Sequence, residues 1–259
     1  MTAMLFVIDV GNTQVVLGVY KDKTLIKHYR LESRSQSTVD EYHLVLRQLM
    51  DVAGISYPMI TGCIMASVVP VLGDTLKQAV HLAFGLETLV VGPGIKTGMP
   101  ILYDNPKEVG ADRIVNAVAA FERVKHGAIV VDFGTATTFD CVSPKGEYLG
   151  GVIAPGLGIS AEALAARTAK LPRTEIVRPP TALGKTTIHS MQSGLVYGHV
   201  GLVDALVSRL KTELGFEVTV IATGGLAHLI HTDSSTIDSV EEYLTLEGLR
   251  VLYDRNVAR

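Results

Sequence analysis

The sequence contains Phe6-Val7-Ile8-Asp9-Val10-Gly11-Asn12-Thr13 near its N-terminus and Ile129-Val130-Val131-Asp132-Phe133-Gly134-Thr135-Ala136-Thr137-Thr138 in its middle. Each copy is a short apolar run followed by Asp, an apolar residue, Gly and small polar residues. The apolar run predicts a buried strand, and the glycine permits a tight turn that approaches a ligand closely. A repeat of this kind indicates two similar halves that face one ligand.

The residue types of the repeat suggest phosphate binding. Hydroxyls and backbone N–H groups in such a turn can hold phosphate oxygens, whereas the carboxylate would hold a cation that binds phosphate. A single copy would more often be a hairpin turn whose Asp bonds its own backbone. Two copies in one chain favour the phosphate interpretation.

The composition is that of an ordered globular protein. The 259 residues are 47% hydrophobic and 19% charged, and they can form one large domain or two modest ones. The net charge is −3 and the basic residues are scattered, so we expect no nucleic-acid partner. Cys63 and Cys141 lie in apolar runs and are expected to be core residues in a reducing compartment.

Residues 52–73 carry no charge and are numerous enough to cross a bilayer. They include prolines and several glycines, which favour a strand with flanking turns. The first basic residue is Lys21, so no signal-peptide n-region is expected. We therefore expect a cytoplasmic protein with no membrane partner.

The order of the predicted elements repeats in the two parts of the chain. The first part has three strands, a helix, a strand and a helix, and then a short strand. The second has three strands, two helices, a strand and a final helix. We expect strands at 5–10, 15–20, 25–31, 62–69, 88–91, 128–132, 137–142, 147–153 and 218–222, and helices at 39–50, 71–84, 111–124, 159–169, 187–214 and 244–257. This is a duplicated α/β plan with an N-terminal half at 1–116 and a C-terminal half at 117–259.

Two regions stand out from this plan. Residues 92–110 form a long irregular stretch, which in a compact domain is usually functional. The predicted helix 187–214 contains Gly194, Gly198 and Gly201, each costing about 1 kcal/mol relative to alanine. Such glycines indicate close packing against the other half or a second subunit.

Three other motifs are weaker. Leu183-Gly184-Lys185-Thr186 resembles the end of a P-loop, but it has Pro179 at the first glycine position and no buried strand before it. Residues 156–161 match the dinucleotide pattern G-x-G-x-x-A, but the prolines of 171–180 exclude a following central strand. His228 and His231 lack a third ligand, and an exposed turn is favoured over a zinc site.

Asp112 and Arg113 follow the long irregular stretch, in the first turn of a predicted helix. Asp112 could simply cap the helix, with Arg113 as a solvated surface charge. Alternatively, the pair is a carboxylate base beside a cation that binds an anion, at the edge of a cleft. The loop context favours the functional interpretation.

These motifs together resemble those of type III pantothenate kinases, and the resemblance runs essentially from end to end. It is carried by residues 9–13, 110–113 and 132–138, together with Ser67-Val68-Val69-Pro70, residues 150–156 and Thr223-Gly224-Gly225. The wider superfamily comprises actin-like ATPases, sugar kinases and heat-shock chaperones. The resemblance implies two ribonuclease-H-like halves, each with a mixed sheet, and an interdomain ATP cleft.

The resemblance also implies an activity and its ligands. The expected reaction is phosphorylation of pantothenate by Mg-ATP to 4'-phosphopantothenate, the first step of coenzyme A biosynthesis. A monovalent cation, potassium or ammonium, is expected beside Mg-ATP. A homodimer with pantothenate near the subunit interface is expected as well.

The resemblance carries site roles onto matching residues. Asp112 matches the proton acceptor, and Asp132 matches the ligand of the monovalent cation. The nucleotide phosphates are expected at Asp9, Val10, Gly11, Asn12, Thr13, Gln14, Val15 and Val16, and at Thr135. The pantothenate contacts are expected at Tyr103, Gly110, Ala111, Asp112, Arg113 and Thr187.

Two other functions would also use a protein of this superfamily. Another kinase of the superfamily could act on a sugar or a carboxylate. An ATP-switched regulator or chaperone would need no acceptor site, so Asp112 and Arg113 would have no use, and a chaperone would need an additional domain.

Overall fold

The computed structural model describes residues 3–257 and divides them into two compact units. The first unit comprises residues 3–99, 104–119 and 245–257, and the second comprises residues 100–103 and 120–244. Each unit contains one five-stranded sheet.

The two sheets have the same strand plan. In the first, β1 (Met4–Val10), β2 (Gln14–Lys21), β3 (Thr24–Glu32), β4 (Ile60–Ser67) and β5 (Thr88–Val90) are arranged in the order β3-β2-β1-β4-β5. In the second, β6 (Ala128–Phe133), β7 (Ala136–Val142), β8 (Tyr148–Pro155), β9 (Thr219–Thr223) and β10 (Ser239–Val240) are arranged in the order β10-β9-β6-β7-β8. In each sheet the first three strands pair antiparallel and the remaining pairs are parallel. The predicted duplication, with a mixed sheet in each half, is confirmed.

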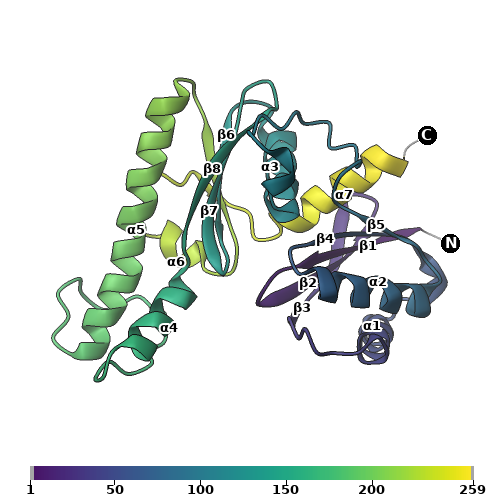
Figure 1. The fold of residues 1–259 in the computed structure, drawn as a ribbon, viewed down its shortest axis with the longest axis horizontal. Coiled ribbons are helices and arrows are strands. Elements are labelled where there is room, and N and C mark those ends of the chain that lie inside the picture. The colour runs from purple at the N-terminus through teal and green to yellow at the C-terminus, as the bar shows by residue number, and fades with distance from the viewer. Residues whose placement is uncertain (1–2, 258–259) are drawn as a thin grey trace. The chain divides into compact units, whose positions relative to one another are not determined.

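Helices cover both faces of the first sheet. α1 (Val39–Ala53) and α2 (Pro70–Phe84) pack on one face, where they share a core with β1, β2 and β4. α7 (Leu244–Val257) lies on the opposite face of this sheet (Figure 1). There, a Cβ on Gly18 of β2 would lie 3.0 Å from Leu246, and Gly62 of β4 faces the ring of Tyr253. Glycines in the strands therefore make room for α7.

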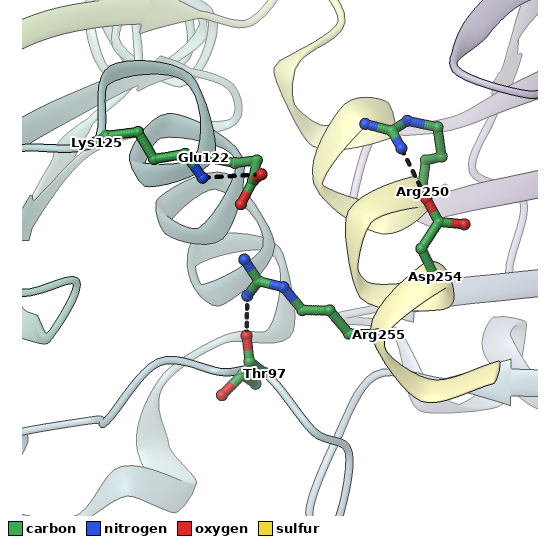
Figure 2. Close-up of polar contacts among 6 residues, drawn as sticks. All are labelled: Thr97, Glu122, Lys125, Arg250, Asp254 and Arg255. Carbon is green, nitrogen blue, oxygen red and sulfur yellow. Dashed lines mark hydrogen bonds and ion pairs between the residues drawn. The ribbon is translucent and has the colours of Figure 1, made fainter. Parts of the chain in front are cut away.

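Polar contacts tie the last helix to the irregular segment after β5. Figure 2 shows Arg255 donating to the carbonyl of Thr97, and Arg250 paired with Asp254 at 2.8 Å. Asn256 exchanges two hydrogen bonds with the backbone of Lys96, at 2.9 and 3.0 Å. The last helix thus belongs to the first compact unit. The predicted halves 1–116 and 117–259 were defined by the repeated order of elements in the sequence. This division stays a prediction.

In the second unit, α4 (Leu157–Arg167), α5 (Thr187–Leu214) and α6 (Ala227–His231) lie on one face of the sheet (Figure 1). Their apolar side chains share a core with Ile129 and Val131 of β6, Phe139 of β7 and Val220 of β9. The bounds of α5 and α7 match the predicted ones, and so do those of α3 (Ala111–Val124).

Four short elements were not predicted from the sequence. These are α6, β10 and two single-turn 3-10 helices, η1 (Tyr57–Met59) and η2 (Pro106–Glu108). β10 consists of two residues, and it is a strand because these residues pair with Ile221 and Ala222 of β9. No local sequence pattern predicts so short a strand. The predicted helix 159–169 begins two residues earlier, at Leu157.

The uncharged segment 52–73 runs from the end of α1 through β4 into α2, which agrees with the expected strand and turns. Across residues 3–257, none of the helices combines the length and apolar character needed to cross a membrane. Cys63 and Cys141 are both buried, as expected of core residues.

We expect Gly248→Ala to lower the free energy of unfolding by about 1 to 3 kcal/mol, because overpacking of a well-packed contact costs that much. A Cβ at Gly248 of α7 would overlap the carbonyl oxygen of Val115 in α3, and a backbone atom cannot rotate away. Chemical denaturation measures the change. The control is Gly158→Ala in α4, where no described atom outside the local backbone lies within 4 Å of the added carbon. Equal stability of the two variants would contradict the prediction.

Candidate functional site

Asp9 lies near the end of β1, between two partner strands. It pairs with Val16 of β2 and with Ala66 of β4, and its side chain is partly buried. The predicted turn follows at once, and the N–H of Gly11 donates to the carbonyl of Gln14 at 3.0 Å. Asn12 and Thr13, with Gln14, are exposed at this end of the sheet. The turn therefore presents small polar groups at this end of the sheet.

Asp132 occupies the same position in the second sheet, paired with Thr138 of β7 and Thr223 of β9. The N–H of Gly134 donates to the carbonyl of Ala136 at 3.1 Å, so this turn is one residue shorter than the first. Gly224, with φ +90, follows β9, and a Cβ there would lie 2.6 Å from Asp132 Oδ1. Only glycine fits this conformation and spacing, so the backbone after β9 approaches the Asp132 carboxylate closely.

A carboxylate oxygen is a suitable ligand for a hard cation. Within residues 3–257, no cluster of three or more His, Cys, Asp or Glu side chains could hold a metal ion. A cation at Asp132 would therefore draw its other ligands from oxygens of the backbone, hydroxyls, water or the nucleotide.

Residues 110–113 open helix α3 in the first unit. The carbonyl of Gly110 accepts from the N–H of Ile114 at 3.2 Å, and Asp112 Oδ1 accepts from the N–H of Arg113 at 2.9 Å. A side chain at Gly110 would overlap Asp112 Oδ1, so the glycine makes room for the carboxylate. Arg113 is only 8% exposed, which excludes its interpretation as a solvated surface charge.

Burial raises the pKa of Asp112 above its ordinary value. The hydrogen bond from the Arg113 N–H and the charge of Arg113 lower the pKa, but the effect of burial is larger. A carboxylate with a raised pKa holds a proton more readily and is the better base. The interpretation as a proton acceptor thus has a physical basis beyond helix capping.

Tyr103 is held against the edge strand of the second sheet. The N–H of Leu102 donates to the carbonyl of Tyr148 at 2.8 Å, and the N–H of Tyr148 donates to the carbonyl of Pro100 at 2.9 Å. The rings of Tyr103 and Tyr148 lie 6.4 Å apart, and Gly150 faces the Tyr103 ring. Residues 100–103 of the irregular stretch are therefore held in place by β8, and Tyr103 lies beside this strand.

Thr187 lines a cavity of about 470 Å³ at the start of α5. The volume falls in the range of small-molecule sites. The lining is mostly apolar with two hydroxyls, and its residues are Leu164, Leu171, Thr187, Ser190, Met191, Gly194 and Leu195.

His199 of α5 was not predicted as a functional or structural residue from the sequence. Its Nε2 lies 2.8 Å from Thr137 Oγ1, its ring lies 5.9 Å from that of Phe133, and it is 7% exposed. It therefore links the long helix to the strand that follows the second turn. One histidine among the apolar residues of a helix carries no signal of its own, so only the fold reveals this contact.

The competing motifs have structural roles. Thr186 caps α5 by accepting from the N–H of His189 at 3.2 Å, and no strand precedes it. Gly156 opens α4, and no strand follows that helix before α5. His228 and His231 lie on the short helix α6 and not on the expected turn, since a single helical turn forms after Gly224.

Comparison with known proteins gives a consistent family. The family model described as type III pantothenate kinase matches residues 5–209. A type III pantothenate kinase of Myxococcus xanthus is 56% identical over 255 residues, which are 98% of this chain and 100% of the relative. One of Anaeromyxobacter sp. strain Fw109-5 is 58% identical over 253 residues, again 98% of this chain and 100% of the relative.

Solved structures share the fold at low sequence identity. A Baf-family protein from Campylobacter jejuni has a TM-score of 0.62 at 17% identity, covering 98% of this chain and 100% of its own. The ROK hexokinase of Thermus thermophilus has a TM-score of 0.52 at 13% identity, covering 96% of this chain and 98% of its own. These similarities confirm the predicted fold class.

We expect His199 to weaken the fold in acid. Burial lowers its pKa below the ordinary 6.5, so on acidification the unfolded chain binds a proton before the native state does. The free energy of unfolding should therefore fall as the pH drops below about 6.5. Urea titrations from pH 7.5 to 5 should show a smaller fall for His199→Gln. His28→Gln, at an exposed position, is the control and should keep the natural slope. An unchanged slope in His199→Gln would exclude this role.

Proposed function

The chain belongs to the type III pantothenate kinase family and phosphorylates pantothenate with ATP, and we propose that Asp112 accepts the proton of the pantothenate hydroxyl during transfer. The products are 4'-phosphopantothenate and ADP, and the reaction opens coenzyme A biosynthesis. The observation that carries the assignment is the half-buried carboxylate of Asp112 at the start of α3, which accepts from the N–H of Arg113 and whose pKa is raised by its burial.

The acceptor is a primary alcohol, whose proton becomes acidic only as its oxygen bonds to phosphorus. A base is therefore needed late in transfer, and a carboxylate of raised pKa serves at that stage. The bond from the Arg113 N–H to Asp112 Oδ1, at 2.9 Å, orients the carboxylate before the substrate arrives.

The nucleotide phosphates would bind at the turn after β1, through residues 9–16, with Thr135 of the second turn as a further contact. Small exposed groups at both turns support this assignment. A kinase of this family uses a divalent metal with ATP, and that ion offsets the charge of the phosphates when bound. The expected ATP cleft between the halves stays a prediction.

Asp132 would hold the monovalent cation, potassium or ammonium. The backbone after β9 approaches this carboxylate closely at Gly224, and the backbone of Asp132 is fixed by strands on both sides. A singly charged ion there would offset part of the phosphate charge without the strict octahedral shell of Mg²⁺.

Pantothenate would contact Tyr103, Thr187 and residues 110–113, with Arg113 binding its carboxylate. The fork of a guanidinium matches a carboxylate in geometry and charge. The cavity beside Thr187 supports this placement, since its apolar walls suit the dimethyl carbon of the substrate.

A homodimer would cover the glycine face of α5. Gly194, Gly198 and Gly201 are exposed on one side of the helix, and no described atom beyond the local backbone lies within 4 Å of a Cβ placed on any of them. Close packing against the same chain therefore does not explain them. Gly194 also lines the Thr187 cavity, so a partner on this face would approach the proposed pantothenate contact.

We expect Asp112→Asn to lower turnover by roughly 10²–10⁴-fold, because the amide cannot accept the proton. ADP release that depends on pantothenate measures the rate, and ATP binding by calorimetry should be unchanged. Near-natural turnover would remove Asp112 from the role.

The stability of the same variant provides its control. With its raised pKa, the native carboxyl binds a proton before the unfolded one does, so ionisation above the ordinary 3.8 costs stability. Asn carries no charge, and the variant should melt at the same temperature as the natural protein or higher at pH 7. A lower melting temperature would show that the loss of turnover reflects a damaged fold.

We expect the rate of Asp132→Ala to lose its response to potassium, because the carboxylate that binds the ion is gone. Rates in KCl and NaCl at equal ionic strength measure the response. Asp74→Ala, at an exposed position of α2, is the control and should keep it. A potassium dependence that persists in Asp132→Ala would refute the assignment.

A further inference from the structure

We propose that Ser33, the residue after β3, is a positioning residue that holds the turn Gly11–Thr13 in the shape that binds nucleotide phosphate. The inference rests on the proposed function of that turn. Nothing in the sequence singles out Ser33, which lies in the exposed segment between β3 and α1.

Two hydrogen bonds join Ser33 to the turn. Its Oγ donates to the carbonyl of Gly11 at 2.6 Å, and its N–H donates to the carbonyl of Thr13 at 2.9 Å. The carbonyls at the two ends of the turn are thus occupied by a single residue.

The direction of these carbonyls matters for an anion. Carbonyl oxygens are acceptors and carry partial negative charge, so they repel phosphate oxygens. A turn that binds phosphate must therefore keep its carbonyls directed elsewhere. Ser33 does this for Gly11 and Thr13, and the Gly11 N–H to Gln14 bond at 3.0 Å closes the turn from within.

The second unit uses the same position in another way. Gln14 pairs with Glu32 and Ala136 pairs with Pro155, so Gly156 is the register equivalent of Ser33. A Cβ on Gly156 would lie 2.7 Å from the carbonyl oxygen of Gly134, in the second turn. The residue after the third strand therefore lies against the turn after the first strand in both units. In the first unit the contact is made by a hydroxyl, and in the second it is made by the backbone of a glycine.

Ser33→Ala removes the hydroxyl bond and leaves the backbone bond. We expect the KM for ATP to rise about three- to tenfold, the effect of one hydrogen bond, while the KM for pantothenate stays unchanged. The dissociation constant for Mg-ADP, measured by calorimetry, should rise by a similar factor. Ser33→Thr keeps the hydroxyl and should restore both values. Ser35→Ala, two residues away and exposed, is the matched control and should behave like the natural protein.

A selective rise for the nucleotide, with rescue by Thr, would support the proposal. Unchanged nucleotide constants, equal rises for both substrates, or a failure of Thr to rescue would overturn it. The calorimetric measurement needs no acceptor. It therefore tests Ser33 even if the natural protein shows no ADP release stimulated by pantothenate, a result that would count against the proposed function alone.

Discussion

Each unit depends on a central strand that is paired on both sides up to its acidic residue. β1 is paired with β2 and β4 through Asp9 and Val10, and β6 is paired with β7 and β9 through Asp132. The backbone of each carboxylate is therefore fixed by folding, before any ligand binds. This matters for phosphoryl transfer, where catalysis comes mostly from positioning and charge. The entropy of ordering these groups is lost once, in folding, and not again at each turnover.

The carboxylates of Asp112 and Asp132 each lie close to the backbone of a glycine. Gly110 makes room for the Asp112 carboxylate, and Gly224 comes up against that of Asp132. Burial then acts on Asp112 in two ways, since the raised pKa makes it a better base and makes the ionised native state less stable. Functional sites commonly combine a perturbed pKa with such a cost in stability.

The repeat, the three antiparallel strands of each unit and the long helices were predictable because their patterns are local and extended. The bounds of α3, α5 and α7 follow from long apolar periodicity and from flanking Gly and Thr. β10, the seating of Tyr103 on β8 and the contact of His199 with Thr137 join residues far apart in sequence. No local signal marks such pairs, because the free energy that forms them comes from tertiary contact. The site roles came from motif resemblance, and the pKa of Asp112 required the fold.

The two copies of the motif share a backbone plan but differ in the groups around it. The first turn is one residue longer, and its carbonyls are held by the hydroxyl and N–H of Ser33. In the second turn, the carbonyls lie against Gly156, and the Asp132 carboxylate lies against Gly224. A turn whose carbonyls are occupied is compatible with the anion proposed for it, and a carboxylate oxygen is compatible with the proposed cation. The duplicated strand plan therefore places the two acidic residues at equivalent positions, whereas the residues after the third and fourth strands differ between the two units.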